Sequence, residues 1–273
     1  PSDFTINSIS PIITSGFSPV FNSNGYHISC NGAADGTINA SASGGTGGFI
    51  YSIDGTNFQP YPIFSGLLAG TYTIYYKDAN SCIGTEILTL NEPPALSGTA
   101  SITQAVDCYN ENTGEITFTV APAQPGIPPY AYSIDNGANS QPSSTLTNLT
   151  GNISYPLMIE DNNGCSFTDT IYLAEPTQII YSSTVSNYNG FGVSCNGDSD
   201  GIITISAVGG TGALTYSLDA INYQSSPVFS GLSAVTHTVS YKDANGCEFT
   251  TDVSLTEPGV FSVSHVSSNY SGA

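Results

Sequence analysis

Apolar and polar residues alternate along several short stretches of this chain, which is the pattern of half-buried β-strands. In the stretch 71–77, the side chains of Tyr72, Ile74 and Tyr76 share one face. Two later stretches repeat this spacing, with Tyr155, Leu157 and Ile159 and with His237, Val239 and Tyr241. We expect these residues to form the core-facing sides of three equivalent strands. No stretch shows the helical period of an amphipathic helix.

The first third of the chain predicts a series of strands and turns. Residues 37–42 and 49–53 have strand character, with a glycine-rich hairpin turn at 44–48 between them. Residues 71–77 and 85–90 predict a second hairpin around 78–81. The segment 67–72, which ends in Tyr72, has the spacing of a tyrosine corner, in which a Tyr hydroxyl ties the start of a strand to the loop before it. His237 stands at the equivalent position later on, and we expect it to replace the tyrosine in the core.

The chain carries one sequence unit three times. Each copy begins around a cysteine, with Cys-Asn-Gly-x-x-Asp-Gly-x-Ile at 30–38 and 195–203 and a degenerate version at 108–116. Each continues with Asp-x-Asn-x-Cys at 78–82, 161–165 and 243–247, and ends in Glu-Pro at 92–93, 175–176 and 257–258. These marks predict repeats at 1–93, 94–176 and 177–258. Residues 259–273 resemble the segment that precedes Cys195, so we expect them to begin a fourth copy in a longer parent protein.

The repeat length and the strand pattern together predict the fold class. Units of about 80 to 90 residues suit a row of small domains better than a solenoid of short repeats. Short strands at regular spacing between glycine-rich turns are typical of β-sandwiches with about seven strands. We therefore expect an all-β chain of three tandem Ig-like β-sandwiches.

Charge and hydropathy exclude several classes of partner. Two basic residues stand against 21 acidic ones, which gives a net charge of −19. Nucleic acid and anionic membrane surfaces are therefore poor partners, whereas cations are better ones. No apolar run is long enough to cross a membrane, so we expect no membrane insertion in this segment. The six cysteines fit an oxidising, extracellular compartment.

Two pairings of the cysteines are open from the sequence, and free thiols or another topology are the remaining alternatives. Pairing within each repeat would join Cys30 to Cys82, Cys108 to Cys165 and Cys195 to Cys247, and would staple each small domain. In ordinary Ig topology, however, the turns that hold these cysteines lie at opposite ends of the sandwich, too far apart to bridge. Pairing between neighbouring repeats would instead join Cys30 to Cys165 and Cys108 to Cys247.

Carboxylates accompany the cysteines in every repeat. The set that we single out as candidate calcium ligands is Asp35, Asp78, Glu92, Asp161, Glu175, Asp200, Asp243 and Glu257. Carboxylate oxygens from such loops are what Ca²⁺ prefers, although no contiguous EF-hand loop is present. The alternative is that these side chains cap turns by hydrogen bonds to the backbone, which their Asp-Gly and Asn-Gly contexts favour.

The sequence offers nothing that recurs as an enzyme site. His27, His237 and His265 occupy unrelated positions in the repeats, so they form no shared catalytic group. The glycine-rich segment 44–48 lacks the following helix that a phosphate-binding loop requires. We expect a protein that is not an enzyme.

The order of six motifs resembles the SprB-repeat family. These are the Cys-Asn-Gly motif, Gly-Gly-Thr-Gly, Tyr-Ser-Ile/Leu-Asp, Gly-Leu, Asp-Ala-Asn-Gly-Cys and Glu-Pro. The second copy departs from it, with Thr113 in place of the motif Asp and 124–129 in place of Gly-Gly-Thr-Gly. The resemblance implies a segment of a very large adhesin on the surface of gliding Bacteroidetes, exported by the type IX system and moved by the gliding machinery.

Two roles for the segment follow from that resemblance. The repeats could bind an external surface or its polysaccharide directly, or they could act as an extended, structural spacer that carries an adhesive site elsewhere. The chain has no Trp, and its tyrosines form no exposed stripe that repeats from copy to copy. This favours the structural role.

Overall fold

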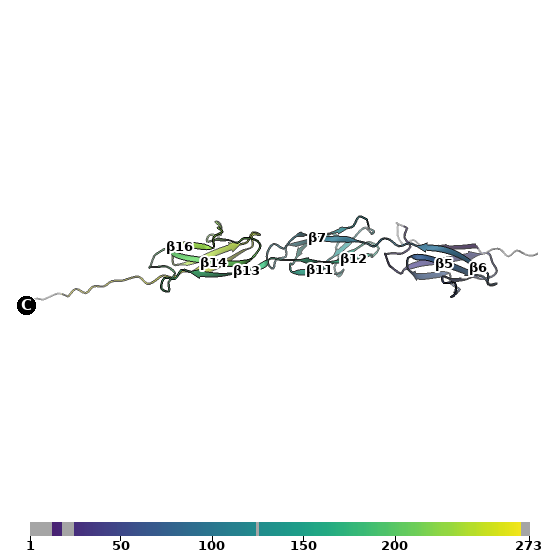
Figure 1. The fold of residues 1–273 in the computed structure, drawn as a ribbon, viewed down its shortest axis with the longest axis horizontal. Helices are drawn as coiled ribbons and strands as arrows, with labels where there is room; N and C mark the ends of the chain where they lie inside the picture. The colour runs from purple at the N-terminus through teal and green to yellow at the C-terminus, as the bar shows by residue number, and fades with distance from the viewer. Residues whose placement is uncertain (1–12, 18–24, 124–125, 269–273) are drawn as a thin grey trace, which may run out of the picture. The chain divides into compact units, whose positions relative to one another are not determined.

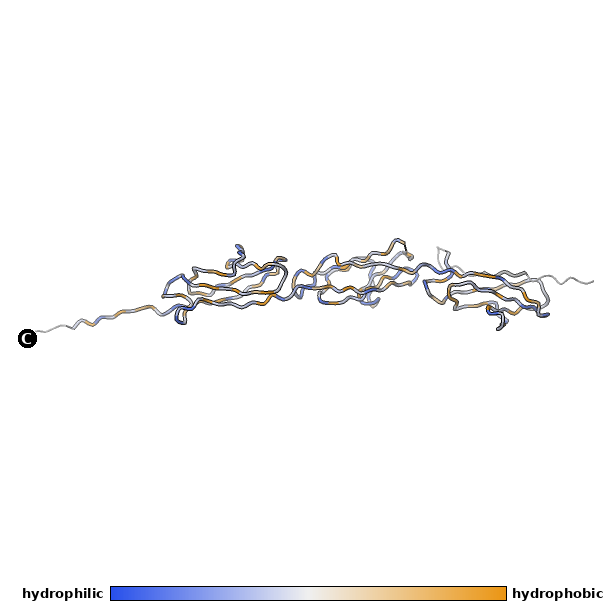
Figure 2. The backbone as a smooth tube through the Cα atoms, in the orientation of Figure 1, coloured by the Kyte–Doolittle hydropathy of each residue, from blue (hydrophilic) through white to orange (hydrophobic). Residues whose placement is uncertain are grey.

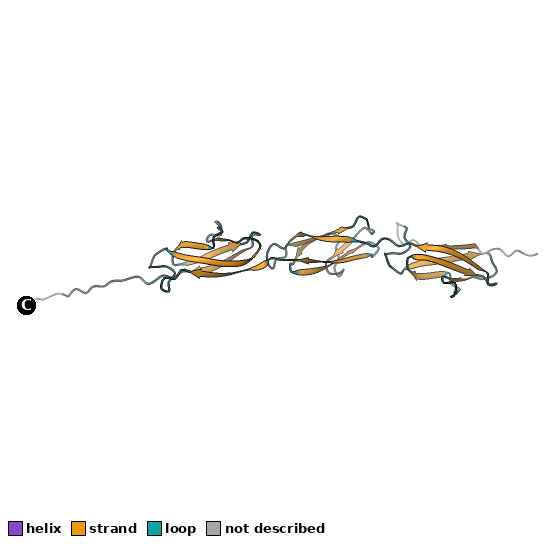
Figure 3. Ribbon diagram, in the orientation of Figure 1, coloured by secondary structure: helices purple, strands orange, loops and turns teal. Residues whose placement is uncertain are grey.

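The computed structural model describes residues 13–17, 25–123 and 126–268, and this part of the chain consists of β-strands and loops without a helix (Figure 3). Eighteen strands follow one another in it, and Figure 1 labels several of them. The expected all-β class is confirmed. Orange and blue segments alternate along the backbone in Figure 2, as the sequence pattern of the strands requires.

Contacts group the chain into two compact units. The first comprises Pro1–Ser101, Thr117–Thr145 and Tyr155–Ile171, and the second comprises Ile102–Ile116, Leu146–Ser154 and Tyr172–Ala273. The division passes through strands of the second sequence repeat, so about two thirds of that repeat belongs to the first unit and the rest to the second. The predicted boundaries at 93, 176 and 258 describe the sequence units and stay a prediction as domain limits.

The first repeat forms two three-stranded sheets. One has the order β1 (Ile13–Phe17), β2 (Gly36–Ser43), β4 (Ile63–Leu67), and the other has the order β3 (Ile50–Ser52), β5 (Gly70–Lys77), β6 (Ile83–Leu90). All described pairings in them are antiparallel. Ile38 and Phe64 of the first sheet share one buried cluster with Ile74 and Tyr76 of the second, so the two sheets form a sandwich.

The third repeat has the same topology. Its sheets are β13 (Thr177–Val185), β14 (Gly201–Gly210), β16 (Val228–Leu232) and β15 (Thr215–Ser217), β17 (Thr236–Lys242), β18 (Glu248–Ser254). Ile203 and Phe229 of one sheet pack in one cluster with Val239 and Tyr241 of the other. The register shifts at the start of β14, between Gly201 and Ile202, as it does between Gly36 and Thr37 of β2. Tandem copies of one sandwich therefore account for the repeat in the sequence.

The second repeat supplies the remaining sheets. They are β7 (Gly98–Gln104), β8 (Gly114–Val120) and β10 (Thr145–Leu149), in the order β10-β8-β7, and β9 (Ala131–Ser133), β11 (Ile153–Glu160) and β12 (Ser166–Leu173), in the order β12-β11-β9. The predicted core face of β11 is confirmed, because Leu157 and Ile159 are buried. Val239 and Tyr241 are equally buried in β17, and Ile74 and Tyr76 in β5.

The expectation of about seven strands per repeat is wrong for the described residues, where each repeat has six. The segment before β4 makes only an isolated bridge from Gln59 to Tyr51 instead of a further strand. Pro60 and Pro62 flank this segment and have no N–H to donate to a ladder. The Gln59 side chain instead donates to the carbonyl oxygens of Tyr61 and Ile63, at 2.9 and 3.0 Å.

The predicted hairpin turn at 44–48 is also wrong. β2 and β3 belong to different sheets, so this glycine-rich segment crosses from one sheet to the other. The alternation of the flanking strands gives no information about which sheet each one joins. The second predicted hairpin is confirmed, because β5 and β6 pair throughout from Gly70↔Leu90 to Lys77↔Ile83.

Candidate functional site: the cysteine loops

In each repeat, the loop that ends at the second cysteine is stabilised by a buried aspartate. We call these segments, at 77–82, 160–165 and 242–247, the second-cysteine loops. Asp78 is 4% exposed, and its carboxylate accepts hydrogen bonds from the backbone N–H groups of Thr46, Asn80 and Cys82 at 3.0, 3.0 and 2.8 Å. Burial alone would raise the pKa of Asp78, but these backbone donors outweigh it and lower the pKa. The carboxylate therefore fixes the loop in its ionised form.

Asp161 and Asp243 repeat this arrangement. Asp161 accepts from the N–H groups of Ile127, Asn163 and Cys165, at 2.9, 2.9 and 3.0 Å. Asp243 accepts from those of Thr211, Asn245 and Cys247, at 2.7, 3.0 and 2.9 Å. In every repeat one donor is the N–H of the second cysteine itself, so the aspartate fixes the backbone position of that cysteine.

The first-cysteine loop, at 30–36, 108–114 and 195–201, has its own acceptors. Asp35 accepts from the N–H of Ser29 at 3.2 Å, and Asp200 accepts from that of Ser194 at 3.0 Å. In the second repeat the hydroxyl of Thr113 takes over, accepting from the N–H of Asp107 at 2.8 Å. The substitution that marks this copy in the sequence therefore keeps the contact.

The glutamate of each Glu-Pro pair also binds the first-cysteine loop. Glu92 accepts from the N–H of Gly32 at 2.6 Å, and Glu257 accepts from that of Gly197 at 2.8 Å. Glu175 makes the same contact with Asn110 at 3.2 Å. This glutamate thus joins the end of each repeat to its beginning.

The candidate calcium ligands are therefore all engaged with backbone donors. Within 13–17, 25–123 and 126–268, no three His, Cys, Asp or Glu side chains gather closely enough to hold a metal ion. The geometry is that of turn capping, which was the alternative interpretation of these residues. Calcium binding stays a prediction of the sequence.

Two disulfides link neighbouring repeats. Cys30 is bonded to Cys165, with their Cα atoms 5.4 Å apart, and Cys108 is bonded to Cys247, with their Cα atoms 5.7 Å apart. Each bond lies inside one of the two compact units. The pairing within repeats, Cys30 with Cys82, Cys108 with Cys165 and Cys195 with Cys247, is wrong. The structure has the pairing between repeats, which the separation of the two kinds of loop had favoured.

Polar contacts accompany both disulfides. The side-chain amide of Asn245 donates to the carbonyl oxygen of Asp107 at 2.9 Å, next to the bond from Cys108 to Cys247. Each second cysteine also brings its Sγ to 3.3 Å from the carbonyl oxygen just before its partner, which is Ser29 for Cys165 and Asp107 for Cys247. A disulfide sulfur has no proton to donate, so these are close contacts that define how the loops fit.

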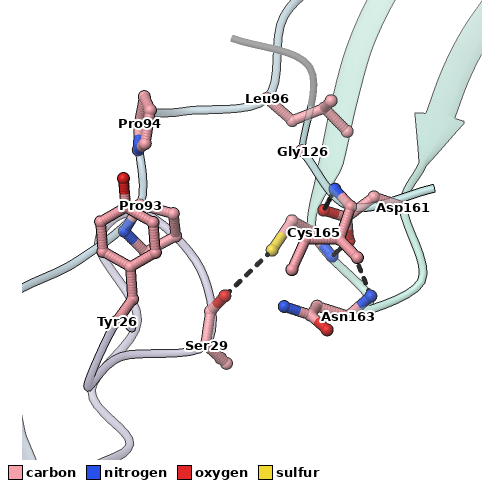
Figure 4. A pocket seen from close by; sticks show the side chains of 10 residues that line it. Tyr26, Ser29, Pro93, Pro94, Leu96, Gly126, Asp161, Asn163 and Cys165 are labelled. Atoms are coloured by element: carbon pink, nitrogen blue, oxygen red, sulfur yellow. Dashed lines mark hydrogen bonds between the residues drawn. The ribbon is translucent and has the colours of Figure 1, made fainter. Parts of the chain in front are cut away.

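A small pocket lies beside the first disulfide (Figure 4). Tyr26, Pro93 and Pro94 face Cys165 and Asn163 across it. Its volume of about 130 Å³ is below the roughly 300–1,000 Å³ of ligand pockets. The pocket is therefore better explained as imperfect packing where two loops meet than as a binding site.

Cys82 and Cys195 are free and exposed. Their loops have the same internal hydrogen bonds as those of the bonded cysteines. The N–H of Cys82 donates to Asp78 at 2.8 Å, and the carbonyl of Cys195 accepts from the N–H of Asp198 at 3.2 Å, as that of Cys108 does from Glu111 at 3.2 Å. The loop structure therefore does not depend on the disulfide.

A third recurring arrangement was missed as a site in the sequence. Ser52, Ser133 and Ser217 are fully buried and donate their hydroxyls to Asp54, Asp135 and Asp219, at 2.8, 2.6 and 2.7 Å. An asparagine a few residues later donates its amide to each of these aspartates. The Ser133 hydroxyl, followed by the donors of Asn139, lowers the pKa of Asp135 to about 2. The Tyr-Ser-x-Asp motif was visible, but its pattern is that of an ordinary turn.

Both basic side chains contact aromatic rings. The Lys77 Nζ lies 3.9 Å from the centre of the Phe58 ring, and the Lys242 Nζ lies 3.7 Å from that of Tyr223. Tyr223 also donates its hydroxyl to Glu248. The two lysines occupy equivalent positions, at the ends of β5 and β17, and their cation–π contacts stabilise local structure there.

Comparisons with known proteins bear on the repeats. A family model described as "SprB repeat" matches residues 28–58, 100–139 and 193–222. No curated protein matches the sequence. No helix capable of spanning a membrane occurs in the described part of the chain.

Several solved structures are similar at low identity. Fibronectin(III)-like modules of Clostridium thermocellum CbhA are 13% identical, with 60% of this chain and 94% of that chain covered and a TM-score of 0.26. The protocadherin GammaB4 extracellular domain is 12% identical, with 84% and 46% covered and a TM-score of 0.23. Protocadherin Gamma B2 cadherin domains 3–6 are 11% identical, with 92% and 77% covered and a TM-score of 0.25. Similarity at this level adds nothing to the sheet topology described above.

Proposed function

We propose that the chain, three regions of which match the SprB-repeat family, serves as an extended, structural segment of a cell-surface adhesin. In this role the repeats hold an adhesive site away from the cell, at the cell surface, and take part in attachment and gliding motility. Export by the type IX system and coupling to the gliding machinery belong to the same proposal, on the strength of the family. Repeats of this kind are typically structural, not catalytic.

The observation that carries the proposal is the pair of disulfides between neighbouring repeats. A single short linker leaves two domains free to reorient, whereas a second covalent connection restricts them. The hydrogen bond from Asn245 to Asp107 adds a directional contact at one of these connections. Such restriction suits a spacer, which must hold its two ends at a fixed distance from each other.

Direct binding of polysaccharide is the alternative role, and the exposed aromatic residues favour it less. Tyr61 and Tyr172 are 73% and 53% exposed, as sugar-stacking residues need to be. Ser143 and Ser226 stand where Tyr61 would recur, so its ring is not repeated along the chain. A binding surface that depends on many copies would show the same ring in each of them.

The spacer role is tested by comparing the chain with a Cys165→Ser/Cys247→Ser variant, which lacks both disulfides. Small-angle X-ray scattering measures the distribution of interatomic distances in each. We expect a narrow distribution for the unmodified chain and a broader one, shifted to shorter maximum distances, for the variant. Identical distributions would show that the disulfides do not restrict the repeats and would contradict the proposal.

A second measurement addresses adhesion itself. Retention of the purified chain on agarose, cellulose and glass is compared with retention of the double variant. We expect neither protein to be retained, because the adhesive site lies elsewhere in a spacer model. Retention of the unmodified chain on any of these surfaces would show that the repeats themselves are adhesive and would contradict the spacer model.

A further inference from the structure

The two disulfides follow one rule. In each, the first cysteine of one repeat is bonded to the second cysteine of the next repeat: Cys30 to Cys165, and Cys108 to Cys247. The rule uses one first-cysteine loop and one second-cysteine loop for every connection. It leaves Cys82, a second cysteine, and Cys195, a first cysteine, as the unbonded members of the series.

The unbonded loops have the same shape as the bonded ones. The N–H of Ala79 donates to the carbonyl of Thr46 at 3.0 Å beside Cys82, and the N–H of Ala244 donates to that of Thr211 at 2.9 Å beside Cys247. Asp78 and Asp243 hold the two cysteines by the same three backbone contacts. A pre-formed loop loses little conformational entropy when its partner binds.

The exposure of the cysteines differs in the way that this rule requires. Cys247 is 7% exposed in its disulfide, whereas Cys82 in the equivalent loop is exposed. Cys195 is likewise exposed, whereas its bonded equivalent Cys108 packs against the buried cluster of the third repeat. A bonded cysteine of each kind is thus less exposed than its unbonded equivalent.

We propose that the Cys82 loop and the Cys195 loop are the two complementary halves of one further connection. Cys82 takes the first cysteine of another repeat of this kind, and Cys195 takes the second cysteine of another. A second copy of this chain presents both loops, so Cys82 of one copy bonds to Cys195 of the other. This inference goes beyond the spacer role, since it assigns a site and a partner to two specific residues.

The connection from Cys108 to Cys247 indicates a contact that forms in the new one. Asn80 aligns with Asn245, whose amide donates to the carbonyl just before the partner cysteine, that of Asp107. Ser194 precedes Cys195 in the same way. The side-chain amide of Asn80 therefore donates to the Ser194 carbonyl of the other copy. This contact makes the pairing directional.

The bond forms by thiol–disulfide exchange, and the oxidant is a small disulfide such as oxidised glutathione. One cysteine thiolate attacks the glutathione disulfide, which gives a mixed disulfide and releases one glutathione thiolate. The second cysteine thiolate attacks the protein sulfur of that mixed disulfide and releases the other. Two protein thiols are oxidised to one disulfide, and one glutathione disulfide is reduced to two thiols.

The test uses two full-length variants that each retain one of the two free cysteines. Cys82→Ser keeps Cys195, and Cys195→Ser keeps Cys82. One variant is labelled with ¹⁵N, and equal amounts are mixed in a glutathione redox buffer. Intact-mass spectrometry then separates heterodimers from the two homodimers, and peptide mapping identifies the bonded cysteines.

We expect heterodimers to exceed the homodimers by about tenfold, which corresponds to only about 1.4 kcal/mol of complementarity between the loops. Adding Asn80→Ala to the Cys195→Ser variant should reduce this excess, while Asn57→Ala, a change in an exposed turn, should not. Random pairing would give as much heterodimer as the two homodimers together. That result, or no dimer at all, would overturn the proposal.

Analysis of the protein taken from its native source shows whether the partner is another polypeptide or a repeat of the same one. Alkylation before reduction should leave Cys82 and Cys195 unlabelled, because both are bonded. If reduction then lowers the apparent mass, the partner is another polypeptide; if the mass stays the same, the partner is a repeat of the same polypeptide. Alkylated Cys82 and Cys195 in the native protein would overturn the proposal.

Discussion

The Nε2 of His237 lies 3.0 Å from the carbonyl oxygen of Ser233. The hydroxyl of Tyr72 makes the equivalent contact in the first repeat, with the carbonyl of Leu68 at 3.0 Å. A carbonyl oxygen only accepts, so Nε2 carries the proton in this contact. The histidine therefore replaces the tyrosine of the corner in function as well as in position, whereas the sequence predicted only that it takes the place of the tyrosine in the core.

This contact predicts the effect of two substitutions at position 237. His237→Tyr keeps a donor, whereas His237→Phe fills similar space without one. We expect the Phe variant to be less stable than the Tyr variant by about 1 kcal/mol, the usual value of one hydrogen bond. Thermal unfolding of the two variants measures the difference, and equal stability would show that the corner contributes nothing.

Ser81 predicts a stabilising substitution. It has a φ of 67°, where the equivalent Gly164 and Gly246 have 81° and 88°. A side chain is strained in this region, so Ser81→Gly should stabilise the first repeat by roughly 0.5–1 kcal/mol. Gly246→Ser is the matched reverse change, because a Cβ at Gly246 meets nothing within 4 Å and only the backbone is strained. Shifts of the unfolding midpoint in the same direction for both variants would contradict this account.

Gly201, in the Asp-Gly pair of the first motif, leaves no room for a side chain. A Cβ there would lie 2.7 Å from the carbonyl oxygen of Leu232 and 2.6 Å from the Cδ1 of Leu255. We expect Gly201→Ala to destabilise the third repeat by about 1–3 kcal/mol through overpacking. Gly259→Ala is the control, since its Cβ meets nothing within 4 Å. Unfolding by denaturant compares the two, and an unaffected Gly201→Ala variant would refute the steric explanation of the motif.

The buried serines predict how stability depends on pH. The pKa of Asp135 is lowered to about 2, chiefly by the Ser133 hydroxyl, and the pKa values of Asp54 and Asp219 are lowered as well. The folded state therefore binds fewer protons than the unfolded state below about pH 4. The stabilisation is complete above that pH and is lost as the pH falls through the folded pKa.

Ser133→Ala tests this linkage. The substitution removes the largest cause of the shift, so the pKa of Asp135 should rise towards its ordinary value of 3.8. The variant should also lose less stability between about pH 4 and 2 than the unmodified chain. Carboxyl NMR titration and unfolding at several pH values measure both, with the exposed Ser166→Ala as control. An unchanged Asp135 pKa in Ser133→Ala would exclude the serine as its cause.

The hydrogen bonds of the carboxylates in the cysteine loops predict that calcium has no specific effect on stability. Asp78, Asp161 and Asp243 each accept three backbone hydrogen bonds, which occupy the oxygens that a cation would need. We expect the unfolding midpoint in calcium to equal that in magnesium at the same ionic strength, with chelator as the reference. The magnesium control is needed because any divalent cation screens a net charge of −19. A rise specific to calcium would restore the calcium hypothesis and make Glu92, Glu175 and Glu257 the next residues to replace.

Much of each sandwich could be predicted because it depends on local sequence. The alternation of Tyr72, Ile74 and Tyr76 reports directly on which side of a strand is buried. Sheet membership could not be predicted in the same way, as the crossing at 44–48 shows, since it depends on pairing between distant strands. In the first repeat, Pro60 and Pro62 have no N–H to donate to a ladder, and the strand spacing alone did not reveal their effect on the segment before β4.

The cysteine loops were recognised, and their roles stood among the alternatives, but the sequence could not choose between them. Matching positions in every repeat suggest a bond within the repeat, because the sequence unit suggests a structural unit. The bonded partner of Cys30 lies 135 residues away, and no local pattern specifies such a distance. The carboxylates were also recognised in the sequence. The backbone N–H groups that donate to them could not be, because every residue type except proline has such a group.

The two disulfides between neighbouring repeats determine which parts of the chain bear load when its ends are pulled apart. The shortest covalent path from Cys30 to Cys247 runs through both bonds and through only the backbone between Cys108 and Cys165. Under tension the remaining backbone between Cys30 and Cys247 bears no load and cannot be drawn out. A chain built in this way can lengthen under force only by the backbone between Cys108 and Cys165, so the two bonds set an upper limit on how far its ends can be drawn apart.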